Sequence, residues 1–184
     1  PVSAELNKIA KAITRSEGRG ILVGGAVRDH FMDRRISKDL DVEVFGLSME
    51  KLESVLKQFG NIHAVGKSFG VLKLKTTTAE YDFSLPRRDQ KTGKGHRGFK
   101  IITDPAMSFK EAASRRDFTV NSMGYDLLEN TLLDPFEGIK DIKNKKLRHV
   151  GPAFAEDPLR VFRAMQFSAR LEFNISTQTA KLCR

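Results

Sequence analysis

Apolar residues recur along the chain with two different periods, and each period predicts one type of element. Near the start, Val2, Leu6, Ile9, Ala10 and Ile13 return every three or four positions, which predicts an amphipathic helix. Similar spacing and capping residues predict further helices at residues 26–32, 48–59, 109–114, 139–143, 158–171 and 176–184.

Strands are predicted where apolar and polar residues alternate. Residues 39–45 alternate strictly, which places three carboxylates, those of Asp39, Asp41 and Glu43, on one face of a strand and apolar side chains on the other. Other strands are expected at residues 21–23, 62–65, 71–75, 80–85 and 146–150, with a hairpin at 121–126 and 131–133. The order of elements predicts a mixed α+β domain that is followed, from about residue 152, by a purely helical segment.

Composition narrows the class of protein. The sequence has no run of about 18 apolar residues, so it predicts no membrane span. It begins without the basic and then apolar pattern of a secretory signal, so a cytoplasmic protein is expected. The single cysteine, Cys183, excludes an internal disulfide and a cysteine-based zinc site.

The net charge of +9 is concentrated in two segments. Residues 86–100 hold six basic residues against one acidic residue, and residues 139–150 hold five against one. Clustered positive charge favours a polyanionic partner such as a nucleotide or a nucleic-acid backbone. Two solvated, lysine-rich loops would give the same pattern. Within the first segment, residues 91–98 contain three glycines and no apolar residue, which predicts a mobile loop.

Two polar features are compatible with phosphate chemistry. Gly24 and Gly25 lie between a predicted strand and a predicted helix, where backbone N–H groups can approach a phosphate; an ordinary turn is the alternative. Asp39 and Asp41 point the same way on one strand, with Cα atoms about 6.6 Å apart. Such a pair can share Mg²⁺ ions for phosphoryl or nucleotidyl transfer, or can be a solvent-exposed acidic face. Asp82 supplies a third carboxylate on a strand.

These features occur together with three further motifs, and in this combination the chain resembles the class II tRNA nucleotidyltransferases (CCA-adding enzymes) and the bacterial poly(A) polymerases. Residues 22–29 (LVGGAVRD), followed by residues 39–41 (DLD), are similar to the first family motif. Residues 115–122 (RRDFTVNS) are similar to the RRDFTxN motif, residues 134–138 (DPFEG) to the DP…G element, and residues 156–164 (EDPLRVFRA) to the EDxxR motif.

The resemblance implies a polymerase-β-like nucleotidyltransferase fold, with a mixed, largely antiparallel sheet flanked by helices. It implies that residues 1–151 are the catalytic head and that residues 152–184 are the start of a helical neck. Asp39 and Asp41 would hold catalytic Mg²⁺, and Asp82 would polarise the primer 3′-hydroxyl. The resemblance implies nucleotide contacts for Gly24, Gly25, Arg28, Arg116, Asp117, Asn121, Asp157, Arg160 and Arg163.

The EDxxR segment carries a specific hypothesis about base selection. Asp157 and Arg160 are three residues apart, so they are expected to be neighbours on one face of a helix. A carboxylate beside a guanidinium offers an acceptor and a fork of donors, which can imitate the Watson–Crick edge of a base. Glu156 would orient Arg160, and Arg163 would reach the phosphates. A helix cap with a surface ion pair is the alternative.

The resemblance therefore implies an enzyme that adds CMP or AMP, from CTP or ATP, to the 3′ end of a tRNA. A bacterial poly(A) polymerase is the alternative within the enzyme class. A non-catalytic nucleotide- or RNA-binding module on the same fold is the alternative outside it. The sequence leaves open the choice between CCA, CC-only, A-only and poly(A) addition, as well as the oligomeric state.

Overall fold

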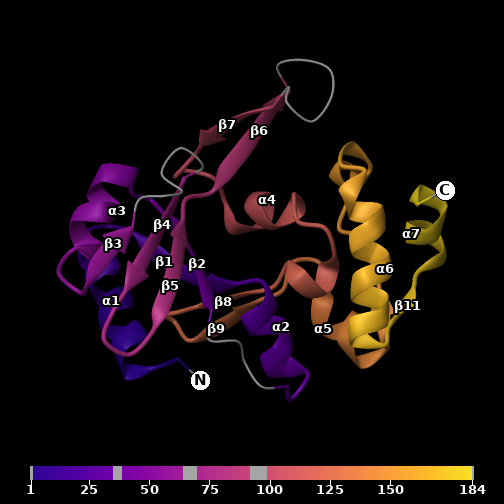
Figure 1. Cartoon of the computed structure of the whole chain (residues 1–184), viewed down its shortest axis with the longest axis horizontal. Coiled ribbons are helices and arrows are strands. Elements are labelled where there is room, and N and C mark those ends of the chain that lie inside the picture. The colour runs from indigo at the N-terminus through magenta and orange to yellow at the C-terminus, as the bar shows by residue number, and fades with distance from the viewer. Residues whose placement is uncertain (1, 35–38, 64–69, 92–98, 184) are drawn as a thin grey trace. The chain divides into compact units, whose positions relative to one another are not determined.

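A computed structural model of the protein describes residues 2–34, 39–63, 70–91 and 99–183 (Figure 1). At residues 39, 88–91 and 99–101 only the backbone is described. The chain forms two units, each with a core of its own. The first unit comprises Pro1–Leu22, Ser37–Ser108 and Tyr125–Thr131, and the second comprises Val23–Ile36, Phe109–Gly124 and Leu132–Arg184.

The main sheet has the strand order β3-β4-β5-β2-β1-β8-β9. Strand β2 pairs with β5 in parallel, whereas β4 is antiparallel to both β3 and β5. The predicted α+β fold with a mixed sheet is confirmed. The strands are β1 (Arg19–Val23), β2 (Asp39–Phe45), β3 (Asn61–His63), β4 (Val71–Lys75), β5 (Glu80–Ser84), β8 (Gly124–Asp126) and β9 (Thr131–Leu133).

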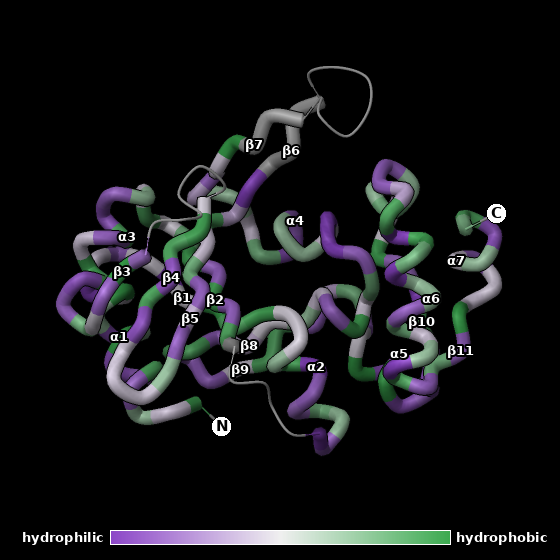
Figure 2. The backbone as a smooth tube through the Cα atoms, viewed as in Figure 1, coloured by the Kyte–Doolittle hydropathy of each residue, from purple (hydrophilic) through white to green (hydrophobic). Residues whose placement is uncertain are grey.

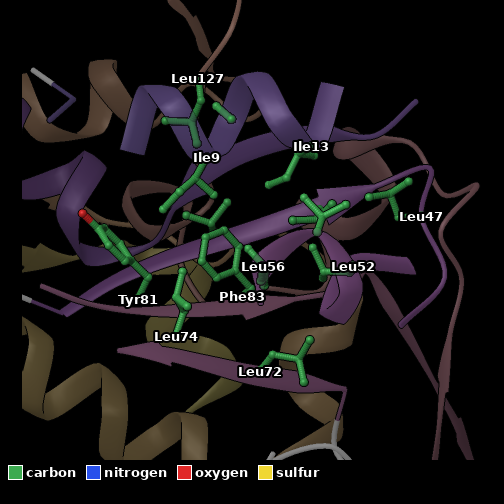
Figure 3. Packing of buried hydrophobic residues seen from close by; sticks show 14 of the residues in the cluster. Ile9, Ile13, Leu47, Leu52, Leu56, Leu72, Leu74, Tyr81, Phe83 and Leu127 are labelled. Atoms are coloured by element: carbon green, nitrogen blue, oxygen red, sulfur yellow. The ribbon is translucent and has the colours of Figure 1, made fainter. Parts of the chain in front are cut away.

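The core of the first unit fixes the direction in which the strands present their polar residues (Figure 3). Ile9 and Ile13 from α1 (Ala4–Arg15) are fully buried, as is Leu52 from α3 (Met49–Leu56). They belong to one apolar cluster with Val42 of β2 and Phe83 of β5. Because successive residues of a strand alternate between faces, the odd positions of β2 and the even positions of β5 lie on the opposite face of the sheet.

The structure contains a second sheet that hydrophobic periodicity does not predict. Strands β6 (Arg87–Lys91) and β7 (Phe99–Thr103) form an antiparallel pair in which Arg87 lies opposite Thr103. Residues 87–91 read RRDQK and have no apolar position, so alternation gives no signal for a strand there. The predicted mobile loop at 91–98 lies outside the described residues, apart from Lys91 at the end of β6.

The second unit packs helices around a cluster of aromatic rings. The ring centroid of Phe118 lies 5.6 Å from that of Phe154 and 5.6 Å from that of Phe167. Figure 2 shows hydrophilic and hydrophobic residues mixed along α6, as expected for a helix with one buried face. The elements are α2 (Gly25–Phe31), α4 (Phe109–Ser114), α5 (Gly138–Lys143), α6 (Leu159–Leu171), α7 (Thr177–Leu182), strands β10 (Lys146–Leu147) and β11 (Asn174–Ile175), and 3₁₀ helices at Thr119–Asn121 and Pro152–Glu156.

Two details of the sequence prediction are wrong in this unit. The strand predicted at residues 121–126 begins only at Gly124, because Asn121 ends a 3₁₀ helix that starts at Thr119. The segment 152–184 is not purely helical, because β11 pairs in parallel with β10. Glu172 ends α6 in the left-handed conformation, at φ 59°, and the buried Phe173 that follows turns the chain back onto the core.

Candidate functional site

The carboxylates predicted for catalysis lie on two neighbouring strands. In the parallel pair of β2 and β5, Asp41 lies opposite Asp82, and Asp39 lies opposite Glu80. Paired positions on adjacent strands are about 4.8 Å apart, and positions two apart along a strand share a face. All four positions therefore lie on the face of the sheet that is opposite to the apolar core. The structure thus brings the three predicted carboxylate positions together.

Asp82 already has a cationic partner from the strand on its other side. In the antiparallel pair of β4 and β5, Lys73 lies opposite Asp82. Its Nζ atom is 2.9 Å from Oδ1 and 3.0 Å from Oδ2 of Asp82. Lys75 and Glu80 make a similar pair two positions along, at 3.3 Å. Lys73 is not among the residues that the sequence predicts for the site, because a lysine on the polar face of a predicted strand gives no signal that singles it out.

The donor chemistry of these positions suits a hard cation. Carboxylate oxygens are preferred ligands of Mg²⁺, and neighbouring carboxylates repel each other unless a cation lies between them. Among the described side chains, no group of three or more His, Cys, Asp or Glu forms a metal site by itself. The fit to Mg²⁺ therefore rests on the pairing of Asp41 on β2 with Asp82 on β5, and on Asp39, which lies two positions before Asp41 on β2. The carboxylate oxygens of these three residues are suitable ligands for Mg²⁺.

The glycine pair forms the turn into α2. Gly24 has a φ of 73°, which favours glycine because a side chain would be strained there. A Cβ atom added to Gly25 would lie 3.4 Å from Nη2 of Arg28, so the guanidinium of Arg28 lies close to the start of the helix. The turn is observed, and its contact with a phosphate stays a prediction.

Four of the predicted nucleotide-binding residues form one hydrogen-bonded network within the second unit. Arg28, which is buried, donates from Nη1 to Oδ1 of Asn121 at 2.6 Å. Asn121 donates from Nδ2 to Oδ1 of Asp117 at 3.1 Å. Arg163 on α6 donates from Nε to Oδ2 of Asp117 at 2.8 Å. Three motifs that are far apart in the sequence therefore meet at buried polar side chains that hold each other in place.

Phe167 lies beside this network and is not among the predicted site residues. The guanidinium carbons of Arg28, Arg163 and Arg170 lie 5.4, 5.1 and 4.6 Å from its ring centroid. These distances are within the range of cation–π contacts. Burial, and after it the repulsion from neighbouring guanidinium groups, lowers the pKa of Arg170. Phe167 is buried, and the helical spacing of α6 gives no indication of the arginines around it.

The geometry expected for the EDxxR motif is wrong in one respect. Helix α6 begins at Leu159, so Asp157 precedes the helix in an extended conformation and does not share a helical face with Arg160. Pro158 explains this difference, because a proline disfavours the helical conformation of the residue before it. The Asp157 carboxylate instead accepts a hydrogen bond from the backbone N–H of Leu159 at 3.0 Å, which is a capping contact.

Arg160 is fixed by main-chain acceptors. It donates from Nη1 to the carbonyl of Ala153 at 2.6 Å and from Nη2 to the carbonyl of Arg115 at 2.7 Å. The contacts found in the described part of the chain thus orient Arg160 through backbone oxygens rather than through Glu156. Arg116 is half-buried next to the network residue Asp117.

The DP…G element has a structural function. Asp134 accepts hydrogen bonds from the backbone N–H groups of Gly138 and Ile139, at 2.6 and 3.0 Å, at the start of α5. A Cβ atom on Gly138 would lie 2.5 Å from the carbonyl oxygen of Thr119, so the close approach of these two segments requires glycine. The start of α5 therefore packs directly against Thr119 of the RRDFTxN segment.

Part of the second basic segment is neutralised by acids of the same unit. Arg148 donates from Nε to Oδ2 of the buried Asp141 at 2.9 Å, and Lys140 pairs with Glu137 at 3.2 Å. These pairs favour a structural role for that part of residues 139–150.

Among the helices that the structure describes, none has the length and the apolar composition that a membrane span requires.

Comparison with known proteins relates the chain to tRNA-processing enzymes. Residues 21–148 match the model of the poly A polymerase head domain. The multifunctional CCA protein of Stenotrophomonas maltophilia (strain R551-3) is 43% identical over 166 residues, which is 89% of this chain and 39% of that protein. The corresponding protein of Xylella fastidiosa (strain 9a5c) is 41% identical over 169 residues, or 90% of this chain and 39% of that protein. The chain thus spans about two fifths of the length of these relatives.

Solved structures show the same relationship. The Bacillus stearothermophilus CCA-adding enzyme in complex with CTP has a TM-score of 0.81 at 28% identity, over 97% of this chain and 42% of that one. A tRNA nucleotidyltransferase complexed with a primer tRNA and an incoming ATP analog has a TM-score of 0.77 at 32% identity, over 95% of this chain and 48% of that one.

Proposed function

The chain belongs to the family of the poly A polymerase head domain, and on this basis we propose that it transfers CMP or AMP from CTP or ATP to the 3′ end of a tRNA. In this reaction the terminal 3′-hydroxyl oxygen attacks the α-phosphorus of the nucleotide, and pyrophosphate leaves. The similarity to CCA proteins and to complexes with CTP, an ATP analog and a primer tRNA supports this choice of substrates.

The register of β2 and β5 is the observation that carries the proposal. It places Asp41 opposite Asp82, with Asp39 on the same face of β2. Asp39 and Asp41 would hold Mg²⁺, as the resemblance implies, and we propose that Asp82, opposite Asp41, is a third ligand. When bound, the ion supplies activation of the hydroxyl and stabilises charge on the triphosphate. A module that only bound nucleotide or RNA would have no need for three carboxylates at these positions.

We assign nucleotide binding to the second unit. The network of Arg28, Asn121, Asp117 and Arg163 holds two guanidinium groups beside two polar side chains that can recognise a ribose. A guanidinium suits phosphate, because it offers a planar fork of donors and keeps its charge. Preorganised groups of this kind lower the cost of orienting a substrate. Gly24 and Gly25 would let backbone N–H groups approach the triphosphate.

Base selection is assigned to the segment around α6. Arg160 is held by two backbone carbonyls, so its orientation is fixed before a nucleotide binds. With Asp157 it would present an acceptor and donors to the edge of cytosine or adenine, with Glu156 beside them. We further propose that residues 1–151 act as the catalytic head and that residues 152–184 open the neck. We also propose that the reaction takes place in the cytoplasm, because its proposed substrate is a tRNA.

A poly(A) polymerase is the second candidate, and the description of the matched family supports it. The two activities differ in the length and sequence of the product. The deciding experiment incubates the protein with tRNA that lacks one, two or three 3′ nucleotides, with CTP and ATP singly and together. Sequencing the products should show additions that stop at CCA. A long tail of A would instead identify a poly(A) polymerase, and no incorporation with any substrate would contradict both.

A further inference from the structure

Lys73 contacts the carboxylate of Asp82, to which a divalent cation is proposed to bind. Its ammonium contacts both carboxylate oxygens of Asp82, at 2.9 and 3.0 Å. The pairing of the strands fixes this arrangement, because Asp82 on β5 has Lys73 opposite it on β4 and Asp41 opposite it on β2. The Lys73 side chain is 57% exposed, so the ion pair is screened by water and can open at little cost.

We propose that Lys73 is a positioning residue that holds Asp82 before metal binds and that competes with the metal for the same oxygens. A Mg²⁺ ion bound directly to an oxygen of Asp82 would lie close to the ammonium of Lys73, so the two cations would repel each other and compete for the carboxylate. Before the ion binds, the ammonium offsets the repulsion between the carboxylates of Asp82 and Asp41. The inference rests on the proposed function, because it takes Asp82 to be a metal ligand.

The chain contains a matched control for this idea. Lys75 and Glu80 form an ion pair of the same type between the same two strands, at 3.3 Å, with both side chains 60% exposed. Glu80 is not one of the three carboxylates proposed to hold metal. Removing the charge of Lys75 therefore changes the net charge of this face by the same amount, without freeing an oxygen of Asp82.

The experiment titrates Mn²⁺ alone into the protein and measures free Mn²⁺ by electron paramagnetic resonance. We compare the wild type with Lys73→Met, Lys73→Arg and Lys75→Met, with circular dichroism to verify that each is folded. Lys73→Met should lower the Kd for Mn²⁺ by about fivefold, since a unit charge close to a divalent ion is removed at a solvent-exposed site. Lys73→Arg and Lys75→Met should stay within about twofold of the wild type.

A further variant separates competition at Asp82 from a general effect of charge. In an Asp82→Asn background, Lys73→Met should no longer tighten binding, because no shared carboxylate remains. Equal Kd values for Lys73→Met and wild type would overturn the inference, as would equal tightening in Lys75→Met. If the folded wild type shows no saturable Mn²⁺ binding, the metal site of the proposed function fails, and the inference fails with it.

Discussion

Replacing Asp117 by Asn should weaken the network that joins the RRDFTxN segment to α6. Oδ1 of Asp117 accepts hydrogen bonds from the backbone N–H of Phe118 at 2.8 Å and from Asn121 at 3.1 Å. Oδ2 accepts from Nε and Nη2 of Arg163 at 2.8 and 2.6 Å. An Asn side chain can keep the first two bonds through its oxygen, but its NH₂ group would then face the guanidinium of Arg163.

The size of the effect follows from these contacts. A hydrogen bond to a charged group contributes about 1.5–3 kcal/mol when buried. The Arg163 side chain is 47% exposed, so solvent screening reduces the contribution of this ion pair. We expect Asp117→Asn to lower the free energy of unfolding by about 1–2 kcal/mol. Asp117→Ala should cost about 3 kcal/mol, because two further donors lose their acceptor.

Urea unfolding of Asp117→Asn, Arg163→Gln and the double variant gives the coupling free energy between the two residues. We expect a coupling of about 1 kcal/mol, together with weaker binding of CTP by both single variants. Asp134→Asn is the matched control, because it alters a helix cap of the same unit and should leave CTP affinity unchanged. Strictly additive free energies would show that Asp117 and Arg163 are not coupled, and unchanged CTP affinity in Asp117→Asn would show that the network does not serve nucleotide binding.

Two other predictions concern stability. Gly138→Ala should lower the free energy of unfolding by about 2–4 kcal/mol in urea, because its Cβ would lie 2.5 Å from the carbonyl of Thr119. Gly151→Ala, which meets nothing within 4 Å, should change it by less than about 1 kcal/mol. Burial alone would raise the pKa of Asp126, but hydrogen bonds from two backbone N–H groups and from Arg19 hold it below its usual value. Because the folded pKa is the lower one, this stabilisation is complete above the unfolded pKa of about 4 and is lost as pH falls through the folded value. Unfolding measured between pH 3 and pH 7 should therefore vary less in Asp126→Asn, and an unchanged profile would contradict this assignment.

Local patterns predicted some elements well because the physical cause is local. Strand β2 occupies residues 39–45 as expected, because strict alternation of apolar and polar residues is the pattern of a strand with one buried face. Alternation does not predict β6, because its five residues are all polar. This strand is instead held by pairing with β7, which lies on the other side of the predicted loop. Local patterns also placed Asp157 on a helix, although Pro158 restricts the residue before it.

The candidate site needed contacts that no local pattern contains. The sequence identified Asp41 and Asp82 separately, but their register depends on parallel pairing of strands that are about 40 residues apart. In the same way, the motifs do not indicate that Asn121 and Arg163 both bind the carboxylate of Asp117, or that Arg28 joins them through Asn121. Such contacts depend on how the whole unit packs, so sequence periodicity carries no information about them.

Single-turnover incorporation of CMP into tRNA that lacks its CCA end measures whether Asp41 and Asp82 act as a catalytic carboxylate pair. Asp41→Asn and Asp82→Asn should each slow incorporation by about 100-fold or more, because each would remove a ligand of the ion that stabilises the transition state. Glu80→Gln, a variant of an exposed carboxylate on the same strand, should stay within about threefold of the wild type. Incorporation at the wild-type rate by a folded Asp41→Asn or Asp82→Asn variant would show that catalysis does not depend on this pair.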